Sequence, residues 1–110
     1  MRPQSCKAKG RRLQQKARDM LLDASVNLEP DDIRSNPMGA HGEDLLFSPL
    51  ARQTYPFSVE CKNVEKLNMW AAIEQAEEYG KYPPMVIFAK NGKEPMVALP
   101  LDKLLEIINK

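Results

Sequence analysis

The sequence has 110 residues, a common size for a single domain with one hydrophobic core. Hydrophobic residues make up 43% and charged residues 28%, which excludes wholesale disorder, and no apolar run reaches the length of a membrane span. Residues 1–16 are basic and polar and lack the apolar centre of a secretory signal, so we expect a cytoplasmic protein without a membrane partner. Two cysteines, Cys6 and Cys61, are too few for a disulfide framework or a four-cysteine zinc site.

The net charge of +1 hides an asymmetry along the chain. Before the first acid, Asp19, come the basic residues Arg2, Lys7, Lys9, Arg11, Arg12, Lys16 and Arg18, and the remainder is net negative. A basic segment on an acidic body suits a polyanion such as nucleic acid, because lysine and arginine that meet phosphates displace counterions. The alternative is a solvated terminus or helix face. We divide the chain into a basic arm, 1–9, and one domain, 10–110.

The first predicted element is a helix over residues 10–24. Its apolar positions recur in steps of three and four along one face: Leu13, Ala17, Met20, Leu21 and Ala24. Pro30 ends the helical pattern, a short strand is expected around Ile33, and residues 35–42, rich in glycine and proline, are expected to form a loop.

Residues 43–48 and 57–62 are predicted as two strands of an antiparallel hairpin with a mid-length loop. In the second strand Glu60 and Lys62 alternate with Cys61, so the acid and the base share one face and the cysteine points into the core.

A second helical pattern covers residues 67–79 and is ended by Gly80. Trp70 and Ile73 lie along one side of this pattern, and we expect Trp70 to belong to the core rather than to stack on a base.

The last part of the chain predicts a hairpin of residues 85–89 and 95–99, joined by Asn91-Gly92, and then an amphipathic helix over 101–108. Pro95 places the final strand at a sheet edge. The fold class is therefore α/β, a mixed central sheet flanked by helices in the order α-ββ-α-ββ-α.

Chemistry is expected where Asp44 and Glu60 converge across the first hairpin, with Lys62 beside them. Two carboxylates can hold a hard divalent cation through oxygen and leave positions for water and a phosphate. Such an ion stabilises charge that develops on a scissile phosphate and lowers the pKa of its water. Lys62 could polarise that water or stabilise the transition state.

The run Gly42-Glu43-Asp44-Leu45-Leu46 followed by Val59-Glu60-Cys61-Lys62 resembles the motif of the PD-(D/E)XK nuclease superfamily. Gln75 and Tyr79 also resemble the Gln-x-x-x-Tyr pattern of RecB-like members. The resemblance implies a restriction-endonuclease-like core and a magnesium-dependent endodeoxyribonuclease, with Mn²⁺ able to substitute. The implied catalytic residues are Asp44, Glu60, Lys62 and Gln75, and the implied metal ligands are Asp44, Glu60 and the backbone carbonyl of Cys61. The implied DNA contacts are Lys9, Arg11, Arg12 and Tyr79.

The small size and element order also resemble virus-type replication-repair nuclease domains and Holliday-junction resolvases. This implies cleavage of branched or junction DNA. Cutting two strands with one site per chain predicts a homodimer or repeated binding, and we favour the homodimer. The sequence departs from those families in its first helix, which offers Gln14 and Gln15 but no glutamate before Asp19, so the third ligand stays open. The proline of the motif is also replaced, by Glu43.

Two other functions remain open. The chain could be a catalytically inactive nucleic-acid-binding module that keeps the fold, or an interaction protein whose basic terminus is merely solvated. Glu60 and Lys62 could then form a salt bridge on an exposed strand, which contributes little to stability.

Overall fold

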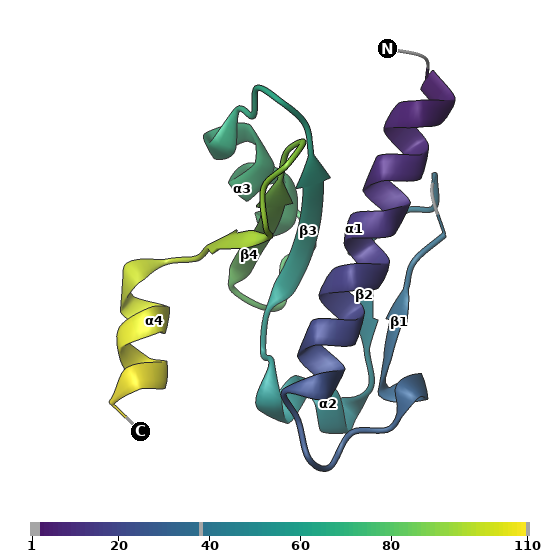
Figure 1. Cartoon of the computed structure of the whole chain (residues 1–110). Helices are drawn as coiled ribbons and strands as arrows, with labels where there is room; N and C mark the ends of the chain where they lie inside the picture. Colours follow the sequence, from purple (N-terminus) through teal and green to yellow (C-terminus); the bar gives the residue numbers. More distant parts are fainter. Residues whose placement is uncertain (1–2, 38, 110) are drawn as a thin grey trace.

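The computed structural model describes residues 3–37 and 39–109 and shows a compact α/β domain (Figure 1). Its elements, in chain order, are α1 (Pro3–Asp23), the 3-10 helix η1 (Pro30–Asp32), β1 (Ile33–Ser35), β2 (Leu45–Phe47), α2 (Pro49–Thr54), β3 (Ser58–Asn63), α3 (Met69–Glu77), β4 (Pro84–Ala89), β5 (Met96–Ala98) and α4 (Leu101–Ile108).

The strands form two sheets. In the larger sheet, of order β3-β4-β5, β3 runs parallel to β4 and β5 runs antiparallel to β4, so the expected mixed sheet and the β4–β5 hairpin are confirmed. The parallel pair requires a crossover, and α3 provides it. β5 lies at the edge of the sheet, as its preceding proline predicted.

The expected hairpin of residues 43–48 and 57–62 is wrong. β2 pairs in antiparallel register with β1, with Ile33 opposite Phe47, and not with β3. The segment between β2 and β3 is not a turn but the helix α2, and β1 supplies the pairing edge instead. One backbone hydrogen bond, from the Asp44 amide to the Val59 carbonyl at 3.0 Å, still ties the start of β2 to β3.

Local sequence explains why α2 forms. Ser48 is its N-cap and accepts a hydrogen bond from the Ala51 amide at 3.1 Å, while Pro49 occupies the first helical position, where it needs no donor. The Ser48 hydroxyl also donates to Asp32 at 2.7 Å, which fastens α2 to η1.

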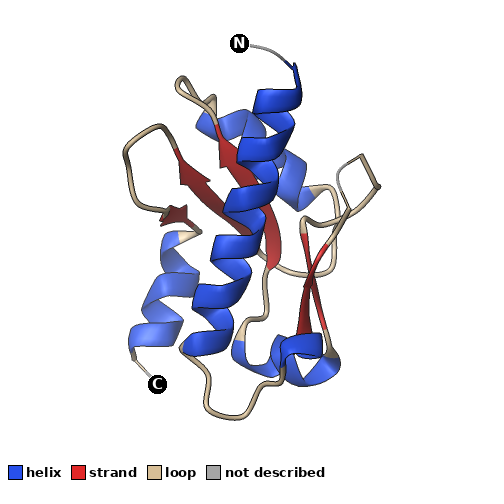
Figure 2. Ribbon diagram, turned by 45° about the vertical axis from the view of Figure 1, so that its right-hand side comes forward, coloured by secondary structure: helices blue, strands red, loops and turns tan. Residues whose placement is uncertain are grey.

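Helices cover the mixed sheet on two sides. α1 packs on β3 from one side and α3 packs on β3 and β4 from the other (Figure 2). The buried core joins α1, both sheets and α2, and contains Leu13, Ala17, Ile33, Leu45, Ala51, Phe57, Val59, Cys61 and Ile87. Cys61 therefore points inward as expected, and Leu13 and Ala17 confirm the apolar face of the first helix.

α1 is longer than its periodicity indicated, because it begins at Pro3 rather than at residue 10. Proline is favoured in the first turn of a helix, and a single internal glycine, Gly10, costs only about 1 kcal/mol. The predicted basic arm is thus helical from residue 3, while residues 1 and 2 lie outside the described residues.

Trp70 is not in the core, contrary to our expectation: it is 74% exposed. The residues of α3 that face the sheet are Ala72 and Ala76. A residue two positions before Ala72 points to the opposite side of a helix, so the close approach of α3 through its alanines leaves Trp70 outside.

Among the described residues, no helix is both long and apolar enough to cross a bilayer.

Candidate metal centre

Asp44, Glu60, Lys62 and Gln75, the four residues expected to be catalytic, line one cavity of about 200 Å³. Its wall is completed by Gly10, Gln14, Pro37, Gly39, Ala40 and Cys61. A larger hollow of about 420 Å³ lies near Phe88 and Met96, but its acids are exposed. Two close carboxylates mark the smaller cavity as the candidate site.

Asp44 is held against β3 by two bonds. Its amide donates to the Val59 carbonyl at 3.0 Å, and its Oδ2 accepts from the Cys61 amide at 2.7 Å. The N–H and C=O of one residue in a strand point to the same edge, so the Cys61 carbonyl also faces the Asp44 side. The Cys61 carbonyl is thus on the correct side to serve as the implied backbone ligand.

Glu60 is buried, at 2% exposure, and bonded to its neighbours. Its pKa is raised to about 8, first by burial and then by a hydrogen bond and charge repulsion from Asp44, which together outweigh the lowering effects of Tyr79 and Lys62. Two adjacent carboxylates such as these share a proton. A divalent cation can take the place of that proton, because the ion stabilises both carboxylates in their charged form.

Tyr79, implied as a DNA contact, is hydrogen-bonded to the site residue Glu60 and is half-buried. Its hydroxyl donates to Glu60 Oε2 at 3.1 Å. Burial and the Glu60 charge raise the pKa of Tyr79 to about 12, and a hydrogen bond with Gln75 lowers it. Gln75 and Tyr79, one helical turn apart on α3 and the following residues, therefore act as a pair beside Glu60.

The Cys61 thiol is separate from this chemistry. Burial, followed by the charges of Asp44 and Glu60, raises its pKa well above the usual range. A neutral buried thiol contributes packing and is a poor metal ligand.

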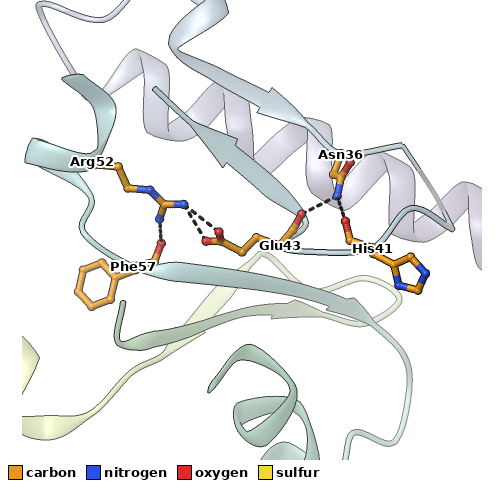
Figure 3. Close-up of polar contacts among 5 residues, drawn as sticks. All are labelled: Asn36, His41, Glu43, Arg52 and Phe57. Atoms are coloured by element: carbon orange, nitrogen blue, oxygen red, sulfur yellow. Dashed lines mark hydrogen bonds and ion pairs between the residues drawn. The ribbon is translucent and has the colours of Figure 1, made fainter. Parts of the chain in front are cut away.

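A polar brace holds the chain that leads into Asp44 (Figure 3). Arg52 Nη2 lies 2.9 Å from both carboxylate oxygens of Glu43, and Arg52 Nη1 donates to the Phe57 carbonyl. On the other side, the buried Asn36 side chain donates to the carbonyls of His41 and Glu43 at 3.0 and 2.9 Å. The residue before Asp44 is thus fixed by both its side chain and its backbone.

Arg52 is itself enclosed by aromatic rings. Its guanidinium carbon lies 4.9 Å from the ring centre of Phe47 and 4.3 Å from that of Tyr82. Its part in the fold is therefore positional, and it is not displayed as a phosphate contact.

Gln14 is a site residue that sequence reasoning did not select. It is buried, lines the cavity, and accepts a hydrogen bond from the Ser35 hydroxyl at 2.6 Å through Oε1. Its position beside Leu13 and three residues before Ala17, both on the apolar face, was the available signal. Gln14 occupies the place on the first helix where an acid was sought.

The donor set around the cavity is made of oxygens: two carboxylates, a backbone carbonyl and the amide groups of Gln14 and Gln75. Hard oxygen donors suit Mg²⁺ or Mn²⁺ better than softer metals. Within the described ranges, however, no group of three or more histidine, cysteine, aspartate or glutamate side chains could hold a metal together. The residues fit a cation held by two protein carboxylates and otherwise by neutral oxygens.

The expected DNA contacts Lys9, Arg11 and Arg12 do not line the cavity, although their neighbours Gly10 and Gln14 do. Arg11 and Arg12 are exposed, and Arg12, two positions from both Gly10 and Gln14, points to the opposite side of α1. Lys9 is half-buried, and its carbonyl accepts from Asn63 at 3.4 Å.

Comparison with models of known protein families, with curated proteins and with solved structures gave no match.

Proposed function

We propose that this protein is a divalent-metal-dependent nuclease of the PD-(D/E)XK type that hydrolyses phosphodiester bonds in DNA. The observation that carries the proposal is the convergence of Asp44, Glu60, Lys62 and Gln75 on one cavity. The order of elements also supports a restriction-endonuclease-like core: a long helix, an antiparallel strand pair with Asp44 just before its second strand, a strand carrying Glu60 and Lys62, and a crossover helix to a parallel strand.

In the proposed mechanism, Asp44, Glu60 and the Cys61 carbonyl hold Mg²⁺ or Mn²⁺. The bound ion supplies charge stabilisation at the phosphate and a more acidic water. Lys62 orients the attacking water and stabilises negative charge on the phosphate, and Gln75 with Tyr79 fixes the Glu60 carboxylate. The water oxygen bonds to phosphorus as one P–O ester bond breaks, and the leaving oxygen takes up a proton.

Substrate selection follows from the basic residues of α1. Lys9, Arg11 and Arg12 would provide phosphate contacts that carry no base information, so the proposal favours recognition of DNA shape, such as branches or junctions. Cutting both strands of a duplex needs either two copies of the site or repeated binding by one copy, and the proposal favours a homodimer.

A cleavage assay tests the proposal. Labelled duplex, single-stranded, flapped and four-way-junction DNA would be incubated with Mg²⁺, Mn²⁺ or chelator. Wild type should cut only with metal, and Asp44→Asn, Glu60→Gln and Lys62→Met should each lower the rate at least about a hundredfold. Matched controls are Asp31→Asn and Lys66→Met, both exposed and outside the cavity. Equal cutting by site and control variants contradicts the proposed site.

The second candidate is a nucleic-acid-binding module without catalysis, which is favoured by the presence of only two carboxylates in the cavity. It predicts that wild type binds the same DNAs in a salt-dependent manner but cuts none of them with either metal. Absence of salt-dependent binding would instead favour an interaction protein with no nucleic-acid partner.

A further inference from the structure

A second cavity, of about 420 Å³, lies outside the candidate metal centre, between the loop that follows β3 and the β4–β5 hairpin. This is the end of the mixed sheet at which the parallel strands β3 and β4 finish. Ligands of open α/β sheets bind outside the carboxyl ends of the strands, in cavities of this size or larger. Most of the walls are apolar and include one aromatic ring: Val64, Leu67, Phe88, Ala89 and Met96.

Four charged residues complete the lining of this second cavity, and they favour an anion. Glu94 is paired with Lys16 at 3.0 Å, and Glu65 accepts a hydrogen bond from a backbone amide of the hairpin turn at 2.8 Å. Lys90 and Lys93 are exposed, and neither forms an ion pair with another residue in the ranges 3–37 and 39–109. Both acids are thus engaged within the protein, whereas two lysines are left for a ligand. The lining therefore suits a ligand with an apolar planar body and an anionic group, and a nucleotide has both.

The register of the sheet connects the second cavity to the metal centre. Phe88 is paired with Lys62 on β3 and with Met96 on β5. Residues paired in register point to the same face of a sheet, and neighbouring strands lie about 4.8 Å apart. Phe88 and Met96, which line the second cavity, therefore lie in one row with Lys62, which lines the metal centre. A nucleotide a short distance along a DNA strand held at Lys62 can thus reach the second cavity.

We propose that the second cavity binds an unpaired base of the DNA strand that the metal centre cuts, an inference that rests on the proposed nuclease function. The base stacks on the ring of Phe88, and Lys90 and Lys93 contact the phosphates beside it. Stacking on an aromatic ring does not require a particular base, and a base within a duplex must first be unpaired. The second cavity therefore selects unpaired DNA, such as a single strand or a flap, rather than a sequence.

The first test is fluorescence anisotropy in chelator with two labelled single strands of about 12 nucleotides, one of thymidines and one without bases. Wild type should bind the thymidine strand at least about fivefold more tightly. Phe88→Leu keeps the apolar bulk but not the ring and should remove most of this difference, whereas Trp70→Leu, at an exposed aromatic residue outside the cavity, should preserve it. Because Phe88 is half-buried, Met96→Glu is a second variant, at a 61% exposed position, where an added negative charge should weaken binding without unfolding the domain.

The lysines are tested by the salt dependence of the same binding. Lys93→Gln should weaken binding of both strands alike and reduce the slope of log affinity against log salt by roughly 0.7, because it removes one phosphate contact to a single strand. Lys81→Gln, at an exposed lysine outside the second cavity, is the matched control and should leave the slope unchanged.

Cleavage by the same proteins with Mg²⁺ is measured separately, so that the two proposals can fail independently. If wild type cuts DNA but Phe88→Leu and Met96→Glu bind both strands as wild type does, the cavity proposal is wrong and the nuclease proposal stands. If wild type prefers the thymidine strand through Phe88 but cuts nothing, the nuclease proposal is wrong and the second cavity is an unpaired-base site without catalysis. Equal affinity of wild type for the two strands, or no binding of either, overturns the cavity proposal. Full competition by free thymidine monophosphate at the concentration of the strand also overturns it, because the ligand is then a free nucleotide.

Discussion

Protonation of Glu60 is coupled to folding. Its pKa is near 8 in the folded protein, against an ordinary value of 4.5, because burial and Asp44 disfavour the charged form. The folded state thus keeps a proton that the unfolded state has already lost above pH 4.5. The free energy of unfolding should decrease as the pH rises from about 4.5 to about 8 without divalent cations.

Chemical unfolding in chelator at pH 5, 6, 7 and 8 measures this effect. We expect a decrease on the order of 1–3 kcal/mol for wild type, reduced from the full shift by solvent screening in the open cavity. Glu60→Gln cannot ionise and should lose this component, and excess Mg²⁺ should also reduce it by favouring the charged pair. Parallel pH profiles for wild type and Glu60→Gln would disprove the coupling.

Arg52 links three segments around the site, and its removal should be costly. Arg52→Met leaves the Glu43 carboxylate, whose side chain is 18% exposed, without its cation and removes the bond to the Phe57 carbonyl. We expect a loss of about 1–3 kcal/mol in urea unfolding.

A double-mutant cycle with Glu43→Gln separates the contribution of the ion pair from that of the aromatic stacking. The control is Arg34→Met, at an exposed arginine, which should change the free energy of unfolding by no more than about 0.5 kcal/mol. If Arg52→Met and Glu43→Gln have additive effects on the free energy of unfolding, the Arg52–Glu43 ion pair contributes nothing to stability.

At the scale of elements, α2 depends on its cap. Ser48→Ala removes the acceptor for the Ala51 amide and the donor to Asp32, and should cost about 1 kcal/mol. The Ser48 hydrogen bond also keeps the pKa of Asp32 below its usual value, so that pKa should rise in the variant.

Nuclear magnetic resonance titration of Asp32 and thermal unfolding measure both effects. Thr54→Ala, at the exposed end of the same helix, is the control. A destabilised Ser48→Ala with an unmoved Asp32 would assign the effect to the helix cap alone.

Elements defined by local pattern were predictable from the sequence. The helix over residues 101–108 has the predicted bounds, and β3 is displaced by one residue, because hydrophobic period and turn residues determine both locally. The partner of β2 was not predictable in this way, since strand pairing depends on which edge the folded chain presents. A three-residue β1, read only as a strand near Ile33, supplied that edge.

The α2 helix was missed although Ser48-Pro49 is a recognisable start signal. Trp70 was wrongly predicted to be buried because Trp70 and Ile73 are spaced as on a buried helix face. The buried residues of α3 are instead Ala72 and Ala76, which have an equally regular spacing.

The candidate site was also predictable from the sequence only in part. Asp44, Glu60 and Lys62 were selected by residue type and their place on predicted strands, and Gln75 by resemblance to a family pattern; the structure brings all four to one cavity. Gln14 and the Arg52–Glu43 brace depend on contacts between segments distant in sequence or on an unrecognised helix. The contacts themselves leave no periodic trace, although the place of Gln14 beside the apolar face of α1 was a signal.

At the scale of the whole molecule, the charge asymmetry should appear in DNA binding. Arg11 and Arg12 are exposed on α1, which precedes the acidic remainder of the chain. If both contact phosphates, Arg11→Gln and Arg12→Gln should each reduce the slope of log affinity against log salt by about 1, with similar weakening for every DNA sequence.

A fluorescence anisotropy titration in Ca²⁺ or chelator, which separates binding from cutting, gives this slope. Arg34→Gln is the matched control. Unchanged slopes for the α1 variants would remove these residues from the DNA contact.

The site also lies across the junction of the two sheets, since Asp44 precedes a strand of the smaller sheet and Glu60 belongs to the larger one. The amides of Asp44 and Cys61 bridge that junction through their bonds to the Val59 carbonyl and the Asp44 carboxylate. A cation bound by both Asp44 and Glu60 would therefore link the smaller sheet to the larger one. Hydrogen exchange at these two amides should slow on metal binding more than exchange elsewhere. Their exchange rates would therefore report whether a cation occupies the site.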